Sequence, residues 1–341
     1  MHLFRRFFNK KKLAKVDSAA HAKRQENRID VDWNNEVYLN LLSRFLKPKD
    51  IVNSVPDHWE SLLGESPQVS LNRCIENGLI VSAPLNAKVE YSNTAASLKK
   101  MLKERSLQVS GNKHELVDRL MAADEEGMLK LYGSKMIFQC SAEARVKVSN
   151  YINNQKSKLD GVIAILLTAL SSRDFEKASL TIQDYESKKL DFSLPNPFAL
   201  KVPPRMTSAD IQELKMIFTL RPKILGELSE IEWEILHVVT SISHLLHGEM
   251  SPKWVPSNFQ WKSKFDILTT VRMMRFHIIY INQIKKMEAC GIEQGRILGC
   301  GASCEECLKI ENRIDLLHDL PELPYESCTN EMGCRCTIIP I

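Results

Sequence analysis

Long apolar segments are absent from this sequence of 341 residues. The longest apolar run, Val162–Leu170, is interrupted by Thr168 and reaches about half the length of a membrane-spanning helix. The opening stretch MHLFRRFFNKKK is basic and aromatic, and it lacks the continuous apolar region of a secretory signal. We therefore expect no membrane span and a cytoplasmic location, a reducing compartment in which structural disulfide bonds are rare.

Motifs of the common enzyme classes are also absent. The chain holds no Walker loop, dinucleotide fingerprint, nucleophile elbow or zinc-protease helix. Acidic residues at Asp174, Glu176, Asp184 and Glu186 could form a nuclease cluster, but Asp174 and Glu176 would point to different sides of a helix. We therefore interpret them as a solvated face. The sequence favours a binding or scaffolding protein over an enzyme, and it indicates no catalytic residue.

A polar stripe is predicted on the helix that follows Ser229. Glu234, His237, Ser241 and His244 recur there at three- and four-residue steps, opposite an apolar side. Two imidazoles and a carboxylate could bind a metal or move protons. Because histidines seven residues apart on a single helix more often mark a partly exposed face, we expect no site here.

Charge is small in total and unevenly distributed. The formal net charge is +4, and the first 25 residues carry eight basic side chains against Asp17 alone, so the remainder is net −3. Any contact with nucleic acid must therefore come from a local patch. We interpret the tail as a flexible, solvated terminus, with contact to nucleic acid or to an acidic membrane surface as the alternatives.

Helical spacing of apolar residues dominates the chain and indicates a mainly α, multi-domain protein. Extended stretches at Leu79–Val81 and Met136–Cys140 predict a small α/β region, Ser229 and Glu232 have capping-box spacing, and a long helix is expected over about 258–289. The predicted parts are a basic flexible tail (1–30), a small helical region (31–94), a helix-loop-helix module (95–125), a helical region (126–192), a proline-rich linker (193–206), a helical domain (207–290) and a cysteine-rich tail (291–341).

Two short amphipathic helices are predicted within residues 95–125. Apolar residues recur at helical spacing in both halves, and Leu107 and Val109 between them can fill the angle where the helices meet. Helices this short must bury their apolar faces against each other and a neighbour. The two stripes comprise Leu98, Met101 and Leu102, followed by Leu116, Val117, Leu120 and Met121.

The polar side of this hairpin has the features of a phosphate-binding surface. Cations crowd the first helix, and the second helix begins with free backbone N–H groups beside a glycine and a lysine. Such contacts position a protein on duplex DNA and read little of its sequence. The candidate nucleic-acid-binding residues are Lys99, Lys100, Lys103, Arg105, Ser110, Gly111, Asn112 and Lys113.

This segment resembles a SAP domain, the helix-loop-helix module generally associated with DNA binding. The resemblance implies that the loop at Ser110–Lys113 and the basic residues of the first helix face the duplex. Ser106 stands where the family usually has a glycine, and because a side chain adopts a left-handed turn only at a cost, we expect the helix end to differ slightly. The matching residues are Leu98, Leu102, Leu107, Ser110, Gly111, Lys113, Leu116, Arg119 and Leu120.

An alternative interpretation of the same segment is a hairpin that packs against protein and leaves a solvated lysine face. Five acidic residues nearly balance the basic ones, so electrostatics alone would not produce tight DNA binding. They are Glu104, Glu115, Asp118, Asp124 and Glu125.

Six of the nine cysteines fall between residues 300 and 336. A Cys-x-x-Cys pair presents two thiolates to one ion, and tetrahedral zinc then needs two more ligands from a second segment. Because alternate residues of an extended chain point to opposite sides, only one of the last two cysteines is expected to bind. The predicted ligands are Cys304, Cys307, Cys328 and Cys336, with Cys334 as the alternative and Cys300 and His318 in reserve.

Four thiolates would leave no open position for water, so the predicted zinc is structural and would supply folding free energy to a tail with little apolar content. Reduced thiols packed in a small core, or disulfides, are the alternatives. The ending CEECLKIENRI to GCRCTIIPI resembles the cysteine-bearing C-terminus of phage minor head-morphogenesis proteins, which implies assembly with protein partners. Tyr325–Cys328 replaces the His-Pro usual in that family.

The sequence thus predicts a cytoplasmic protein that binds duplex DNA with little sequence preference through a SAP-like module and carries a structural zinc site. The first alternative is a head-associated structural protein of phage or prophage type. The second is a DNA-processing enzyme, such as a nuclease, whose site lies in the helical middle and carries no motif.

Overall fold

The computed structural model describes residues 32–52, 54–190, 192 and 207–341, so the predicted basic tail and proline-rich linker lie outside the described residues. The chain divides into two compact units, residues 1–151 and 152–341. Helix α8 (Ala142–Ser171) begins in the first unit and ends in the second. The described residues are mainly helical, as predicted, and contain two small sheets, of which the C-terminal one has three strands where a hairpin was predicted.

The first unit contains an antiparallel sheet in which β3 (Ile137–Cys140) lies between β1 (Lys49–Asp50) and β2 (Ile80–Ser82). Both extended stretches predicted from the sequence are therefore strands. Ile80 and Cys140 are buried and face each other across the ladder. The helical elements beside this sheet in the sequence are α2 (Glu36–Ser43), η2 (Asp57–Trp59), α3 (Glu60–Leu63) and α4 (Pro67–Glu76).

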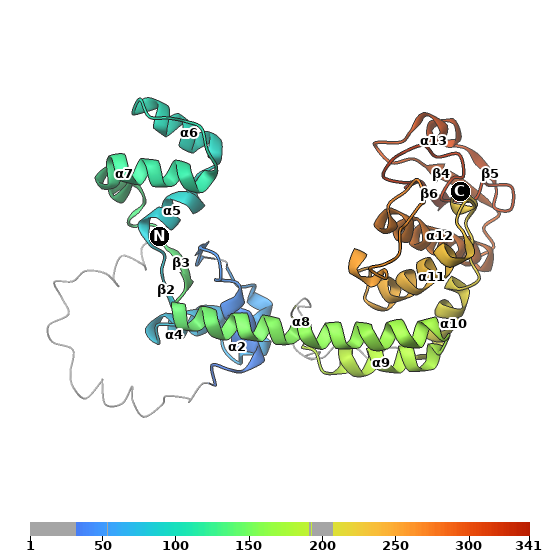
Figure 1. The fold of residues 1–341 in the computed structure, drawn as a ribbon, viewed down its shortest axis with the longest axis horizontal. Coiled ribbons are helices and arrows are strands. Elements are labelled where there is room, and N and C mark those ends of the chain that lie inside the picture. The colour runs from blue at the N-terminus through green and yellow to red at the C-terminus, as the bar shows by residue number, and fades with distance from the viewer. Residues whose placement is uncertain (1–31, 53, 191, 193–206) are drawn as a thin grey trace. The chain divides into compact units, whose positions relative to one another are not determined.

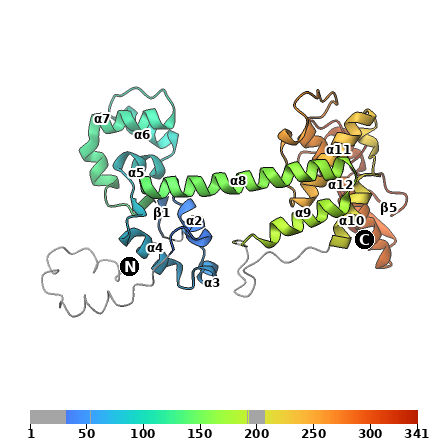
Figure 2. The ribbon, with the colours of Figure 1, turned by 60° about the horizontal axis from the view of Figure 1, so that its bottom comes forward.

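Three helices are inserted between β2 and β3. The backbone N–H of Ala83 donates to the carbonyl of Ile137 at 2.9 Å, so the chain leaves the sheet and returns to it through a paired two-stranded stem. Figures 1 and 2 show the helices together at the end of this stem. They are α5 (Leu85–Ser92), α6 (Ala95–Glu104) and α7 (Lys113–Tyr132).

The inserted helices enclose a hydrophobic core of their own. The two apolar stripes predicted for residues 95–125 meet there, and Val89 of α5 and Met128 of α7 complete the cluster. The core therefore extends beyond the predicted hairpin on both sides. Its fully buried members are Val89, Leu98, Leu102, Leu116, Val117, Leu120 and Met128.

The second unit is a helical assembly with a small sheet. Ser229 and Glu232 form the predicted capping box at the start of α11. The expected long helix begins later than predicted: α12 is capped by Asp266, and before it the indole of Trp261 donates to the carbonyl of Phe265 at 2.8 Å. The helical elements are α9 (Phe175–Ser187), α10 (Thr207–Ile217), η3 (Lys223–Leu225), α11 (Glu230–Leu245), η4 (Pro252–Trp254), α12 (Ile267–Ala289) and α13 (Glu305–Ile310).

The C-terminal region folds as a three-stranded antiparallel sheet, with β4 (Gln294–Leu298) between β5 (Ile314–Leu316) and β6 (Thr337–Pro340). Ile297 and Ile338 are buried in the same hydrophobic cluster as the helices of this unit. The cysteine-rich tail therefore shares a core with α11 and α12. Within the part of the chain that the structure describes, no helix is long and apolar enough to cross a membrane.

Candidate nucleic-acid interface and metal centre

The exposed side of α6 carries three lysines. The hydroxyl of Thr94 caps the helix by accepting from the backbone N–H of Ser97 at 3.1 Å. Leu98 and Leu102 face the core and are fully buried, which turns the other side of the helix to solvent. The lysines on that side are Lys99, Lys100 and Lys103, all exposed.

The end of α6 has a left-handed turn of the kind that helices commonly form with glycine. Ser106 adopts a φ of 56°, in the left-handed region. Its N–H donates to the carbonyl of Lys103 at 3.0 Å, and the N–H of Leu107 donates to that of Leu102 at 2.9 Å, which is a Schellman motif. Ser106 thus adopts the left-handed turn that glycine adopts most readily, and its backbone bears the conformational cost.

The start of α7 is fixed by a capping box. The side chain of Asn112 accepts from the N–H of Glu115 at 3.1 Å, and the Glu115 carboxylate accepts from the N–H of Asn112 at 2.9 Å. Gly111, with a φ of 123°, is required here because a Cβ atom would lie 2.5 Å from that carboxylate. The N–H groups of Lys113 and His114 have no intrahelical partner, so they can donate to an anion.

Arg119 of α7 reaches back to the loop before this helix. Its Nη1 atom donates to the carbonyl oxygens of Gln108 at 2.6 Å and Ser110 at 3.0 Å. Within the loop, Nε2 of Gln108 donates to the hydroxyl of Ser110 at 2.7 Å. The sequence pattern marked Arg119 as a matching residue and assigned it no role.

Arg105, grouped with the lysines in the sequence analysis, lies in a different setting. It donates to the Asp124 carboxylate and to the carbonyl of Met101. Hydrogen bonds from Arg105 and from the N–H of Gly127 lower the pKa of Asp124. Of the candidate cations, Arg105 therefore has the least freedom to reach a phosphate.

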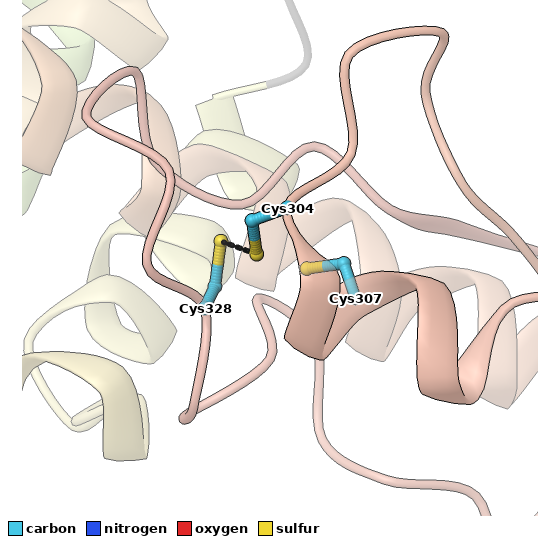
Figure 3. A group of neighbouring side chains, drawn as sticks. All are labelled: Cys304, Cys307 and Cys328. Carbon is cyan, nitrogen blue, oxygen red and sulfur yellow. Dashed lines mark hydrogen bonds between the residues drawn. The ribbon is translucent and has the colours of Figure 1, made fainter.

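The C-terminal cysteines gather as predicted. Cys304, at the start of α13, lies with Cys307 and Cys328 in a trio whose sulfurs are all within 4.8 Å of one another (Figure 3). The sulfurs of Cys304 and Cys328 are 3.7 Å apart, and those of Cys307 and Cys334 are 4.0 Å apart. Zinc–sulfur bonds of about 2.3 Å in a tetrahedron place the sulfurs about 3.8 Å apart. The observed spacing therefore fits a zinc ion bound by thiolates.

The last two cysteines both approach this cluster. Cys307, Cys334 and Cys336 form a second trio within 4.8 Å, so the argument that these two side chains must point apart is wrong. That argument assumed an extended chain, whereas β6 begins only at Thr337. Cys334 is 1% exposed and Cys336 is 8% exposed. The reserve candidates, Cys300 and His318, belong to neither trio.

The thiol acidities reflect this crowding. Burial opposes ionisation of Cys304, but hydrogen bonds, chiefly with the backbone of Cys307 and Thr329, lower its pKa to about 6. Burial raises the pKa of Cys307, and the neighbouring Cys334 thiol raises that of Cys328. Thiolates at this separation repel each other, so the group can ionise completely only with a cation among the sulfurs.

The polar stripe of α11 is exposed at Glu234 and half-buried at His244, as a partly exposed face would be, but it is buried at His237 and Ser241. His237 is 3% exposed, its Nε2 lies 3.0 Å from the carbonyl oxygen of Leu220, and its ring stacks on Trp233. His244 instead pairs with Glu213 at 3.0 Å. The two imidazoles therefore have separate partners and do not form one site.

The acidic residues of the helical middle have separate roles. Asp174 caps α9, and Asp184 pairs with Lys188 at 2.6 Å. The interpretation as a solvated face is wrong for Glu186, which is buried and pairs with His247 at 2.9 Å. Asp174, Glu176 and Asp184 line an open surface depression between α8 and α9.

Comparison with known proteins identifies one family in this chain: the SAP domain, whose model matches residues 92–125. The SAP domain is a DNA-binding module, and this match supports the resemblance stated from the sequence and a DNA-binding role. No curated protein and no solved structure matches the chain. None of the comparisons supports the resemblance of the C-terminal segment to phage head-morphogenesis proteins.

Proposed function

We propose that the inserted helices bind duplex DNA by contacting its phosphate backbone. The proposal is carried by two observations, the exposed lysines of α6 and the N–H groups at the start of α7. Lys99, Lys100 and Lys103 are exposed on α6, and Lys113 stands at a helix start whose N–H groups can donate to an anion. Contacts of this kind read the backbone and give little sequence preference.

The local charge balance limits the affinity of this surface. Glu115 places a carboxylate at the same helix start, and His114 lies 3.5 Å from Glu90 and 3.6 Å from Asp118. A phosphate must therefore approach on the side of the lysines. We expect modest affinity with a clear salt dependence, in which each phosphate neutralised contributes about 0.9 to the slope of log K against log salt.

The test is a fluorescence-anisotropy titration with duplex DNA over a salt series. Replacing Lys99, Lys103 and Lys113 together by alanine should weaken binding and flatten the salt dependence. The matched control replaces Lys130, Lys147 and Lys188 together by alanine and so removes the same net charge. Each of these three lysines pairs with an acidic residue four positions earlier on a helix. Equal affinity and equal slope in both triple variants would disprove the proposal.

We also propose that the cysteine cluster holds one structural zinc ion. Cys304, Cys307 and Cys328 supply three thiolates, and the 4.0 Å distance to Cys307 and the contact with Cys328 favour Cys334 as the fourth over Cys336. The ion would tie α13 to the two segments before β6. With four thiolates bound it has no position for a water molecule, so its role is to stabilise the fold.

A further inference from the structure

The loop that joins α6 to α7, residues 107–112, is anchored at both ends. Leu107 packs against the core of the inserted helices, and Asn112 is fixed by the capping box. Between these anchors the backbone is exposed. Within the described part of the chain, Arg119 is the only side chain outside the loop that donates hydrogen bonds to the loop carbonyls.

Arg119 determines which way two peptide groups face. Nη1 carries two hydrogens, and its two acceptors, the carbonyls of Gln108 and Ser110, occupy both. In a trans peptide the carbonyl and the following N–H point in opposite directions. The N–H groups of Val109 and Gly111 therefore point away from Arg119, and both residues are exposed.

We infer that Arg119 is a positioning residue for DNA binding, which turns the N–H groups of Val109 and Gly111 outward as donors to phosphate oxygens of the duplex backbone. This inference rests on the proposed function of the module. Backbone N–H groups that face solvent can each donate to a phosphate oxygen of the duplex. Arg119 acts through the loop, because its Nη1 hydrogens hold the two carbonyls; a direct contact through its remaining N–H groups, on Nε and Nη2, would appear in the salt slope.

The decisive comparison is between Arg119→Met and Lys113→Met in the full chain, titrated with the same duplex across a salt series. Arg119→Met should weaken binding about tenfold at every salt concentration, the loss that goes with a charge-assisted hydrogen bond, and leave the salt slope unchanged. Lys113→Met should reduce the slope by about 0.9, as expected for the loss of one phosphate contact.

A second readout uses the free protein. The NMR order parameters of the Val109 and Gly111 amides should fall from about 0.85, typical of a rigid backbone, to below about 0.6 in Arg119→Met. A slope reduced by about 0.9 in this variant would show that Arg119 contacts phosphate directly. If the wild type binds DNA, then unchanged order parameters or unchanged DNA affinity in Arg119→Met would overturn the inference and leave the proposed function standing. Absence of DNA binding by the wild type would overturn the proposed function and the inference with it.

Discussion

The guanidinium of Arg105 donates two hydrogen bonds to one carboxylate oxygen of Asp124, from Nε at 2.9 Å and from Nη2 at 2.6 Å. Asp124 is the point at which α7 departs from helical geometry, with φ −154° and ψ 57°. The other oxygen of the same carboxylate accepts from the N–H of Gly127 at 2.9 Å and so caps the second half of the helix. One acidic side chain thus links the end of α6 to the bend in α7.

This pair should make the stability of the inserted helices sensitive to acid. The pKa of Asp124 is held below its ordinary value of 3.8, chiefly by the hydrogen bond from Arg105. A carboxyl group with a lowered pKa stabilises the fold above that ordinary value, and the contribution is lost as the pH falls through the folded pKa. Arg105→Met should therefore lower the thermal unfolding temperature at pH 7, and the deficit should shrink below pH 3.8.

The control for this experiment is Arg145→Met. Arg145 donates to the backbone carbonyl of Leu46, which does not titrate. The loss of unfolding temperature in Arg145→Met should therefore not shrink over the same pH range. Circular dichroism melts of both variants and of the wild type at pH 7 and pH 3 provide the measurement. An Arg105→Met deficit of equal size at both pH values would show that the ion pair adds nothing through ionisation.

Ser106→Gly should stabilise the protein. A residue with a side chain at a φ of 56° bears about 1–2 kcal/mol of conformational strain, which glycine would remove. The greater conformational freedom of glycine in the unfolded chain offsets part of this gain. We expect a net gain of about 0.5–1 kcal/mol in the free energy of unfolding, measured by urea titration. Ser106→Ala keeps the Cβ atom and should show no gain. Equal stability of the two variants would place the strain elsewhere.

The sequence was sufficient where local periodicity determines the structure. The apolar stripes at Leu98 and Leu116, and the strand at Ile137, follow from spacing alone, because each element must bury one face. It was insufficient where two residues meet through the fold. The pairing of Arg105 with Asp124 depends on the angle between two helices, which no local pattern specifies.

The same limit applies to the two premises that the structure contradicts at the candidate sites. The stripe containing His237 was predicted to be partly exposed because it is polar, but its ring is buried under Phe218 and Trp233 with Leu220 as its hydrogen-bond partner. The expectation that only one of Cys334 and Cys336 binds a metal was based on strand alternation, and the strand begins after both. Side-chain polarity and spacing do not determine which segments cover a residue.

His237 should make the second unit less stable in mild acid. Burial lowers its pKa below the ordinary value of 6.5, so the unfolded state binds the proton more readily than the folded state. Stability should therefore fall as the pH drops below 6.5 toward the folded pKa. An NMR titration of the His237 ring should give a midpoint below 6.5, and His237→Gln should weaken the pH dependence of unfolding between pH 7.5 and 5.5. A midpoint at or above 6.5 would contradict the burial argument.

Zinc analysis of cysteine variants should identify the fourth ligand. Cys334 lies 4.0 Å from Cys307, close to the edge of a zinc–sulfur tetrahedron, and it is the more deeply buried of the last two cysteines. Cys334→Ser should therefore lose stoichiometric zinc, and Cys336→Ser should retain it. Cys290→Ser, at an exposed cysteine outside both trios, is the control.

Removal of the proposed ion should also affect the fold, because a metal held by ligands from separate segments would stabilise the folded state over the unfolded one. A chelator should lower the unfolding temperature of the wild type and of Cys290→Ser, and have little further effect on Cys334→Ser. Loss of zinc in Cys336→Ser with retention in Cys334→Ser would restore the ligand set preferred from the sequence. Wild-type protein without zinc would leave the buried thiols as packing residues, and the short sulfur distances would then reflect a hydrophobic core.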